Sequence, residues 1–187
     1  MSHLDGFSVW DLARQGCAEN FTEKLLTLAD KNELETIGGM SRPYFTGTPL
    51  PVAARYGNSA IVQICLENEA NPNTVDSRGR TPLSHAMTTK GLGATLSLLR
   101  HNADVSIADR DGNTPLIYAI ENDLPGLVML LMEKGADPRV KNIGGEASLH
   151  FAARKGHVGC MKILIENGAD LCATDWGGRT VLHIAAE

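Results

Sequence analysis

The feature that most constrains this chain is a sequence pattern that returns every 33 residues. The tripeptide Thr48-Pro49-Leu50 returns as Thr81-Pro82-Leu83 and Thr114-Pro115-Leu116, and degenerate copies begin at Ala147 and Thr180. A fixed period of this length indicates a repeat architecture in which each unit is one small supersecondary structure. A single unit cannot bury its own apolar face, so the units must stack to form a shared core.

Further columns of residues keep the same register, which makes a chance match untenable. Glycines stand two residues before the Thr position, at Gly79, Gly112, Gly145 and Gly178. Alanines stand five residues after it, at Ala53, Ala86, Ala119, Ala152 and Ala185. A third column, between the units, holds an acidic or amide residue: Asp76, Asp109, Asn142 and Asp175.

The chemistry of one unit predicts two short helices and a turn. Thr81 followed by Pro82 suits a helix start, because Thr caps the first turn and Pro needs no hydrogen bond there. We expect this first helix to end near Thr89 and a second to span 92–101, with 125–134 as its counterpart in the next unit. Gly135-Ala136 is typical of a helix stop, and Asp109-x-x-Gly112 of a tight turn.

The motif Thr-Pro-Leu-x-x-Ala, then Gly, Leu-Leu and Gly-Ala-Asp, at this period resembles the ankyrin repeat. The resemblance implies an all-α solenoid of stacked helix-turn-helix units with projecting β-hairpin loops. It predicts repeats at 48–80, 81–113, 114–146 and 147–179 and a partial repeat at 180–187. Residues 1–47 are expected to form a divergent N-terminal capping repeat and loop.

Three departures from the motif carry expectations. The family's His after Thr-Pro-Leu is present only as His150 and His183. Ala147 replaces the capping Thr, which should weaken that helix start by roughly 1 kcal/mol. Gly91 and Gly93 open the second helix of their unit, and since a helical Gly costs about 1 kcal/mol relative to Ala, we expect local looseness there.

The N-terminal region shows weaker likeness to the repeats. Val9 to Gly16 is similar to Leu50 to Gly57, and Phe21 to Asp30 has the pattern of an amphipathic helix. The loop from Lys31 to Gly47 is long, and it is open whether it takes part in binding.

At the other end, the chain stops after the first helix of a unit. Val181, Leu182, Ile184 and Ala185 would then lack the partner helix that should cover them. We interpret the chain as the N-terminal part of a larger protein. A half-repeat that pairs with another subunit is the alternative.

Composition and charge exclude several classes of function. The net charge is −5 and the acids and bases are mixed along the chain, whereas a nucleic-acid binder should show a basic stripe. The longest apolar run, from Leu127 to Met132, is too short to enter a membrane as a span. Four cysteines without CxxC spacing, and no secretory signal, favour the cytosol, with the nucleus as a second location.

Motifs for catalysis, cofactors or metals are missing. The sequence has no phosphate-binding loop, no dinucleotide-binding glycine pattern and no His-Glu-x-x-His. His150 and His183 are better explained as rings that bond the backbone at a helix start than as metal ligands. His85 has no acidic or cysteine companion at ligand spacing, and Cys65 and Cys160 lie in apolar columns and should be buried and inert. We therefore expect a protein that is no enzyme and that needs no cofactor.

The non-repeating positions at the loop tips and at the ends of the first helices are the candidate binding surface. In a stacked array they share one face, and Trp, Tyr and Arg are enriched at interaction hot spots. The candidates are Tyr44, Phe45, Arg55, Tyr56, Arg78, Arg80, Arg110, Asp111, Asn113, Glu121, Arg154, Lys155, Trp176 and Arg179. Trp176 stands out, since an indole in water has little structural purpose. A contact with a partner is one explanation, and packing within the chain or in a crystal is the alternative.

These observations favour a scaffold or adaptor that binds another protein or a peptide. Two alternatives stay open from the sequence. One is a regulatory domain of a larger enzyme or channel, and the other is self-association through the uncovered C-terminal repeat.

Overall fold

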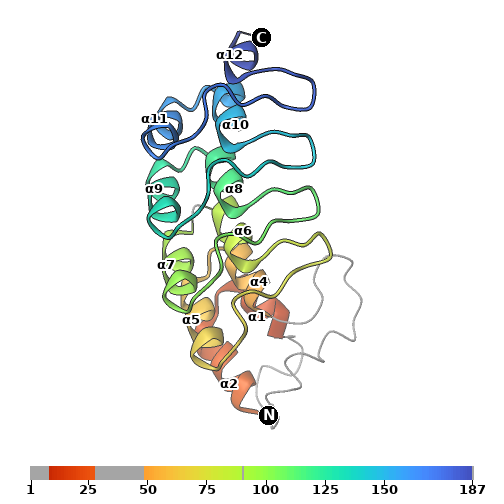
Figure 1. Ribbon diagram of the computed structural model, residues 1–187. Helices are drawn as coiled ribbons and strands as arrows, with labels where there is room; N and C mark the ends of the chain where they lie inside the picture. The colour runs from red at the N-terminus through yellow and green to blue at the C-terminus, as the bar shows by residue number, and fades with distance from the viewer. Residues whose placement is uncertain (1–8, 28–48, 90, 187) are drawn as a thin grey trace. The chain divides into compact units, whose positions relative to one another are not determined.

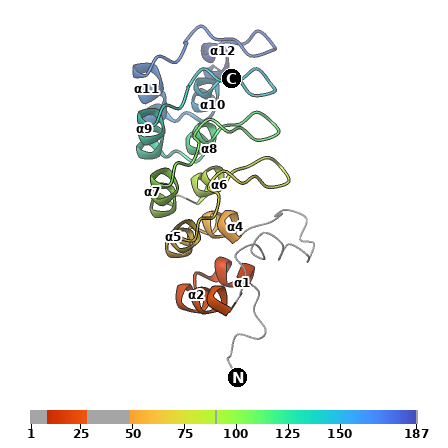
Figure 2. The ribbon, with the colours of Figure 1, turned by 60° about the horizontal axis from the view of Figure 1, so that its bottom comes forward.

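The computed structural model describes residues 9–27, 49–89 and 91–186. The chain divides into two compact units, Met1–Asp104 and Val105–Glu187. Figures 1 and 2 show that each unit is built from short helices in two layers. The inner layer lies next to the projecting loops, and the outer layer lies on the side away from them.

The first unit contains three helix pairs: α1 (Val9–Gln15) with α2 (Ala18–Thr27), α4 (Pro49–Arg55) with α5 (Ser59–Glu67), and α6 (Pro82–Thr88) with α7 (Leu92–Arg100). The inner helices α1, α4 and α6 pack in that order, and the outer helices α2, α5 and α7 do the same.

The second unit contains α8 (Pro115–Glu121), α9 (Pro125–Glu133), α10 (Ser148–Lys155), α11 (Val158–Glu166) and α12 (Val181–Ala185). Its inner helices α8, α10 and α12 pack in order, with α9 against α11 in the outer layer. The prediction of an all-α fold made of stacked helix pairs is confirmed within each unit.

Local sequence chemistry sets the helix ends. The Thr81 side chain accepts a hydrogen bond from the Ser84 N–H, and Pro82 occupies the first turn of α6. α6 ends at Thr88, as expected, while α7 and α9 each end one residue before the predicted limit. After the outer helices the backbone turns left-handed at one repeating position, which holds Glu69, Asn102, Gly135 and Gly168.

The repeated apolar columns form the cores. The Leu of the Thr-Pro-Leu motif is 0–1% exposed in the four full repeats, at Leu50, Leu83, Leu116 and Leu149, whereas Leu182 of the partial repeat is exposed. The alanines that follow it, Ala53, Ala86, Ala119 and Ala152, have no exposed surface at all. Because Ala projects only a methyl group, neighbouring inner helices can approach closely at this column.

Both glycine departures have a structural explanation in α7. Gly91 caps the helix instead of lying inside it. A Cβ at Gly93 would lie 2.9 Å from the Cβ of Ser59, so Gly93 lets α7 pack against α5. The looseness predicted there stays a prediction.

Ala147 offers no side-chain acceptor to α10, but the start of this helix is held in another way. The Ala147 N–H donates to Nδ1 of His150 at 3.2 Å. His183 repeats this arrangement at Thr180. The interpretation of both rings as backbone-bonding groups is confirmed, and the His compensates in part for the missing Thr.

The two chain ends differ in detail from expectation. α2 begins at Ala18, three residues before the predicted start, and the predicted end at Asp30 lies outside the described residues. Val181 and Ile184 are buried because α12 packs against α10, so the expectation that they lack cover is wrong. Leu182 is 74% exposed, as expected.

Candidate protein-binding surface

Each projecting loop is a hairpin that is closed by one repeated side chain at its base. Oδ1 of Asp76 accepts from the N–H groups of Arg78 and Arg80 at 2.8 and 3.0 Å. Asp109, Asn142 and Asp175 accept bonds in the same way in the later loops. The expected tight turns are therefore confirmed, although among the described loops only single bridges, Lys141 to Ala147 and Thr174 to Thr180, have strand character.

The second carboxylate oxygen of the column joins the loop to other groups. Oδ2 of Asp76 bonds the Arg80 guanidinium at 2.9 Å and Nε2 of His85 at 3.0 Å. Oδ2 of Asp109 accepts from the Tyr118 hydroxyl. In the sequence His85 has no acidic companion at metal-ligand spacing, but the hairpin brings Asp76 back against α6, where it hydrogen-bonds the ring.

Burial and charge set the protonation of this cluster. Burial lowers the pKa of His85 to about 4, with the Arg80 charge acting in the same direction. Burial would raise the pKa of Asp76, but the N–H bonds from Arg80 and Arg78 and the Arg80 charge outweigh it and lower that pKa. The neutral ring therefore donates its Nε2–H to an ionised carboxylate at neutral pH.

Two of the predicted contact residues brace their own hairpins. The Arg80 side chain is only 15% exposed beside Asp76, and Arg179 pairs with Asp175 at 2.8 Å. These guanidinium groups are already engaged within the chain, which makes them weaker candidates for partner contact.

The hairpin tips of the second unit are hydrogen-bonded to one another. The Ile143 N–H donates to the Asp111 carbonyl at 2.9 Å, and the Trp176 N–H donates to the Gly144 carbonyl at 3.2 Å. A tip ladder, defined here as these bonds between the loops around Asp111, Ile143 and Trp176, thus joins three consecutive hairpins. It fixes the spacing of their exposed side chains.

Trp176 belongs to this ladder and is also open to solvent. Its Nε1–H donates to the Ile143 carbonyl at 2.9 Å, and the ring lies directly over Gly145. Nζ of Lys141 lies 5.6 Å from the ring centroid. The indole is nevertheless 74% exposed. Trp176 thus packs within the chain, where it links two hairpins, and it still presents an aromatic surface.

Of the remaining predicted contact residues, Tyr44 and Phe45 lie outside the described residues. The others are exposed, except for Asn113. The exposed ones are Arg55, Tyr56, Arg78, Arg110, Asp111, Glu121, Arg154 and Lys155. Asn113 is half-buried and bonds Asn142, and Arg154 pairs with Glu146. Sequence reasoning missed Lys141, whose role depends on reaching the next hairpin.

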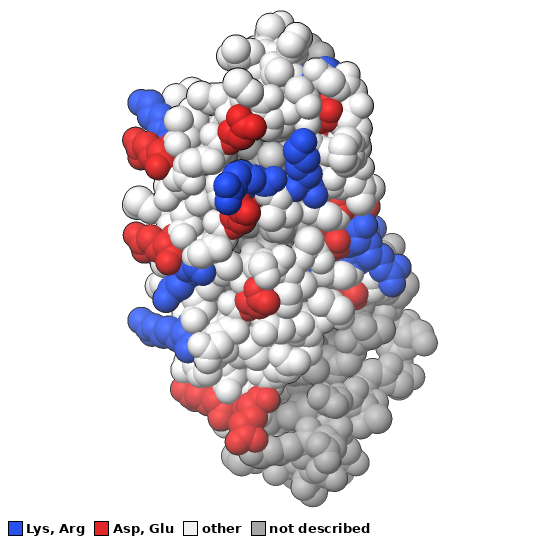
Figure 3. Space-filling view, viewed as in Figure 1, with Lys and Arg blue, Asp and Glu red and all other residues white. Residues whose placement is uncertain are grey.

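Other site chemistries find little support in the described part of the chain. Burial raises the pKa of Cys65 to about 12 and of Cys160 to about 11, so both thiols stay protonated, as expected for inert cysteines. The described residues hold no metal-binding cluster, and none of the described helices is long and apolar enough to cross a membrane. Acidic and basic side chains are interspersed on the face in Figure 3.

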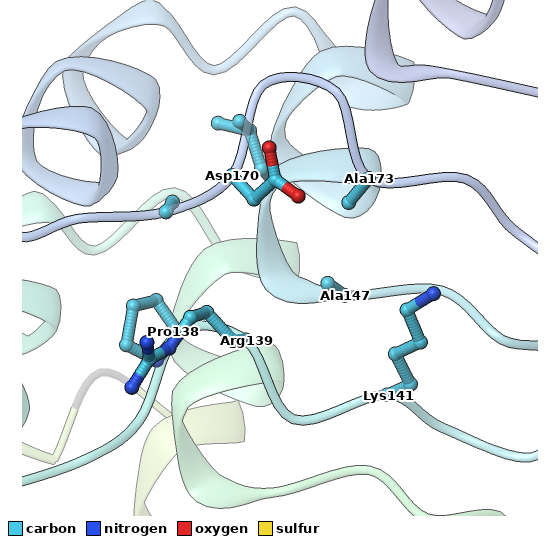
Figure 4. A pocket seen from close by; sticks show the side chains of 8 residues that line it. Pro138, Arg139, Lys141, Ala147, Asp170 and Ala173 are labelled. Atoms are coloured by element: carbon cyan, nitrogen blue, oxygen red, sulfur yellow. The ribbon is translucent and has the colours of Figure 1, made fainter.

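A small hollow lies beside the start of α10 in the second unit (Figure 4). It measures about 130 Å³ and is lined by Pro138, Arg139, Lys141, Ala147, Leu149, Ala169, Asp170 and Ala173. Typical small-molecule sites are roughly 300 to 1,000 Å³. The hollow is too small for such a ligand.

The comparison with known families agrees with this architecture. A family model described as ankyrin repeats in three copies matches residues 11–109, 50–142 and 126–187. No curated protein matches the chain. The chain belongs to the ankyrin repeat family, whose repeats generally bind other proteins and typically have no enzymatic activity.

Proposed function

We propose that this chain is a recognition scaffold that binds a partner protein or peptide through its hairpin tips and the C-terminal ends of its inner helices. The observation that carries the proposal is Trp176, which is 74% exposed and yet held to the neighbouring hairpin by a 2.9 Å hydrogen bond. Large aromatic side chains of this kind supply much of the energy at protein interfaces.

The rigid mounting of the tips supports the same function. Backbone bonds join Ile143 to Asp111 and Trp176 to Gly144. A surface that is ordered before binding loses little conformational entropy when the partner arrives. Exposed Tyr56 and Arg78 offer further anchors in the first unit.

A second candidate is self-association through the face of α12. Leu182 is 74% exposed there. Light scattering over a dilution series tests it. A dimer that Leu182→Glu dissociates would favour this function, and a monomer at all concentrations would exclude it.

The scaffold proposal is tested by affinity capture from a lysate of the cells that make the protein. The tip variant is Tyr56→Ala/Arg78→Ala/Trp176→Ala. The matched control is Met129→Ala/Val158→Ala, which removes side chains that are 52% and 60% exposed on the outer helices.

We expect a partner that the wild type and the outer-helix control capture and that the tip variant loses. Thermal unfolding of all three proteins must be measured alongside, so that loss of binding is not confused with loss of fold. A partner captured equally by the tip variant would contradict the proposal.

A further inference from the structure

The apolar side chains at two neighbouring tips form one exposed patch. Ile143 is 69% exposed and Trp176 is 74% exposed, and the indole Nε1–H bonds the Ile143 carbonyl. The backbone of Gly145 supports the ring from beneath, since a Cβ there would lie only 2.8 Å from ring carbons. An exposed apolar patch that is fixed in place marks an interaction site.

The charged side chains around this patch differ in whether they have an oppositely charged partner. In the hairpins at 138–146 and 171–179, four ionised side chains have oppositely charged partners: Arg139 pairs with Asp137, Glu146 with Arg154, and Asp175 and Arg179 with each other. Lys141 instead donates to the neutral Thr174 carbonyl at 2.8 Å and faces the Trp176 ring. The patch therefore carries one positive charge that no described carboxylate neutralises.

Lys141 has the capacity for another partner. An ammonium group has three N–H donors, of which the Thr174 carbonyl uses one. Contact with the ring and the carbonyl fixes the position of the charge at the rim of the patch. A carboxylate brought there by a partner would gain a charge-assisted hydrogen bond.

We propose that Ile143, Trp176 and Lys141 form a docking site for an acidic segment of a partner protein. A Leu or aromatic side chain of that segment packs on Ile143 and Trp176, and a nearby Asp or Glu pairs with Lys141. This inference rests on the proposed function, because it specifies the chemistry of a partner that binds at the tips.

The test uses short synthetic peptides with blocked ends and the full chain. The acidic peptides carry one central Leu or Phe among Asp and Glu. Their controls replace Asp and Glu by Asn and Gln, or by Lys, or replace the central residue by Ala. Binding is followed by the indole N–H NMR signal of Trp176, which a Trp10→Phe variant assigns because the chain has two tryptophans.

We expect the acidic peptides to shift this signal saturably and to bind at least about tenfold more tightly than the amide, Lys and Ala controls. Added salt should weaken their binding because it screens the ion pair. Lys141→Gln should reduce acidic binding to the level of the amide peptides. Trp176→Phe and Trp176→Ala lack this signal, so their peptide binding is measured by the fluorescence anisotropy of a labelled peptide. Trp176→Phe, which keeps a ring but lacks the Nε1–H, should retain more binding than Trp176→Ala, and Val158→Ala should have no effect.

Three results would overturn the inference: equal binding of amide and acidic peptides, no effect of Lys141→Gln, or no peptide that shifts the Trp176 signal. A dilution-dependent shift of that signal without peptide would assign the patch to a second copy of the chain and would also overturn it. If the peptides fail while a captured partner still depends on the tips, only this inference falls and the proposed function stands.

Discussion

Nε2 of His85 lies 3.0 Å from Oδ2 of Asp76, and both side chains are only 1% exposed. The bond ties the base of a hairpin to the inner helix α6 that follows it. Tyr118 makes the equivalent bond to Asp109 in the next repeat, with a phenol hydroxyl in place of the imidazole. The two repeats thus tie the hairpin base to the inner helix through different donor groups.

Stability should fall as the pH drops from about 6.5 to about 4, because of His85. Its pKa is about 4 in the folded chain against 6.5 for an ordinary His, so in this window the unfolded chain binds a proton that the folded chain does not. The contribution of the His85 pKa shift to the free energy of unfolding is complete above pH 6.5, and roughly 3 kcal/mol of it is lost across the window. Urea unfolding at a series of pH values measures it.

His85→Gln is the matched control, since an amide can donate to Asp76 without titrating. The difference between the wild-type and variant curves should shrink as the pH falls through this window. Asp76, whose folded pKa is lowered, adds a separate loss only below about pH 3.8. Parallel curves from pH 7 to 4 would show that His85 is not held neutral.

Gly145→Ala should destabilise the chain more than Gly178→Ala. Both residues have a left-handed backbone, with φ of 75° and 74°, so each substitution costs about 1–2 kcal/mol of strain. A Cβ at Gly145 would in addition lie 2.7 Å from the backbone nitrogen of Trp176, whereas a Cβ at Gly178 would meet no atom within 4 Å. Overpacking should add roughly 1–3 kcal/mol.

Urea unfolding of the two glycine variants gives the difference directly. Trp176 fluorescence in a Trp10→Phe background should change in Gly145→Ala and stay unchanged in Gly178→Ala. Equal losses in the free energy of unfolding, with an unchanged Trp176 fluorescence spectrum in Gly145→Ala, would mean that the indole does not rest on Gly145.

Asn58→Ala should loosen the C-terminal end of α1. The Nδ2 group of Asn58 donates to the carbonyls of Ala13 and Arg14, the latter at 3.0 Å. Helix-end carbonyls without a partner destabilise the last turn, so the loss should be about 1 kcal/mol, with faster amide hydrogen exchange in α1.

Asn58→Asp tests the same link with a side chain of equal size. A carboxylate cannot donate to these carbonyls, and its charge opposes the negative end of the helix dipole. It should therefore cost more than Asn58→Ala. Wild-type protection of α1 in the Asp variant would rule out the capping role.

Much of the fold follows from the sequence because its signals are local. Thr81 and Pro82 specify a helix start by their own bonding and ring geometry, and the predicted helix limits fall within three residues of those found. The cover over Val181 and Ile184 was harder to predict, because it depends on how deeply α12 packs against α10.

The binding surface was less predictable, because its bonds cross between repeats. Nothing near Trp176 in the sequence indicates that its indole bonds Ile143, 33 residues earlier, or that Lys141 reaches Thr174. The Asp76 column was visible as a turn signal, but its partner His85 lies on the following helix. Such contacts depend on how the repeats stack, because stacking brings together residues that are far apart in the sequence.

Site-specific photo-crosslinking tests the central claim most directly. A photoreactive amino acid replaces Ile143 at the tip in one protein and Val158 on the outer helix in another, at positions that are 69% and 60% exposed. After irradiation with the captured partner, the account predicts crosslinks from position 143 and none from position 158. Crosslinks from position 158 alone would show that the partner binds the outer helices and would contradict the account.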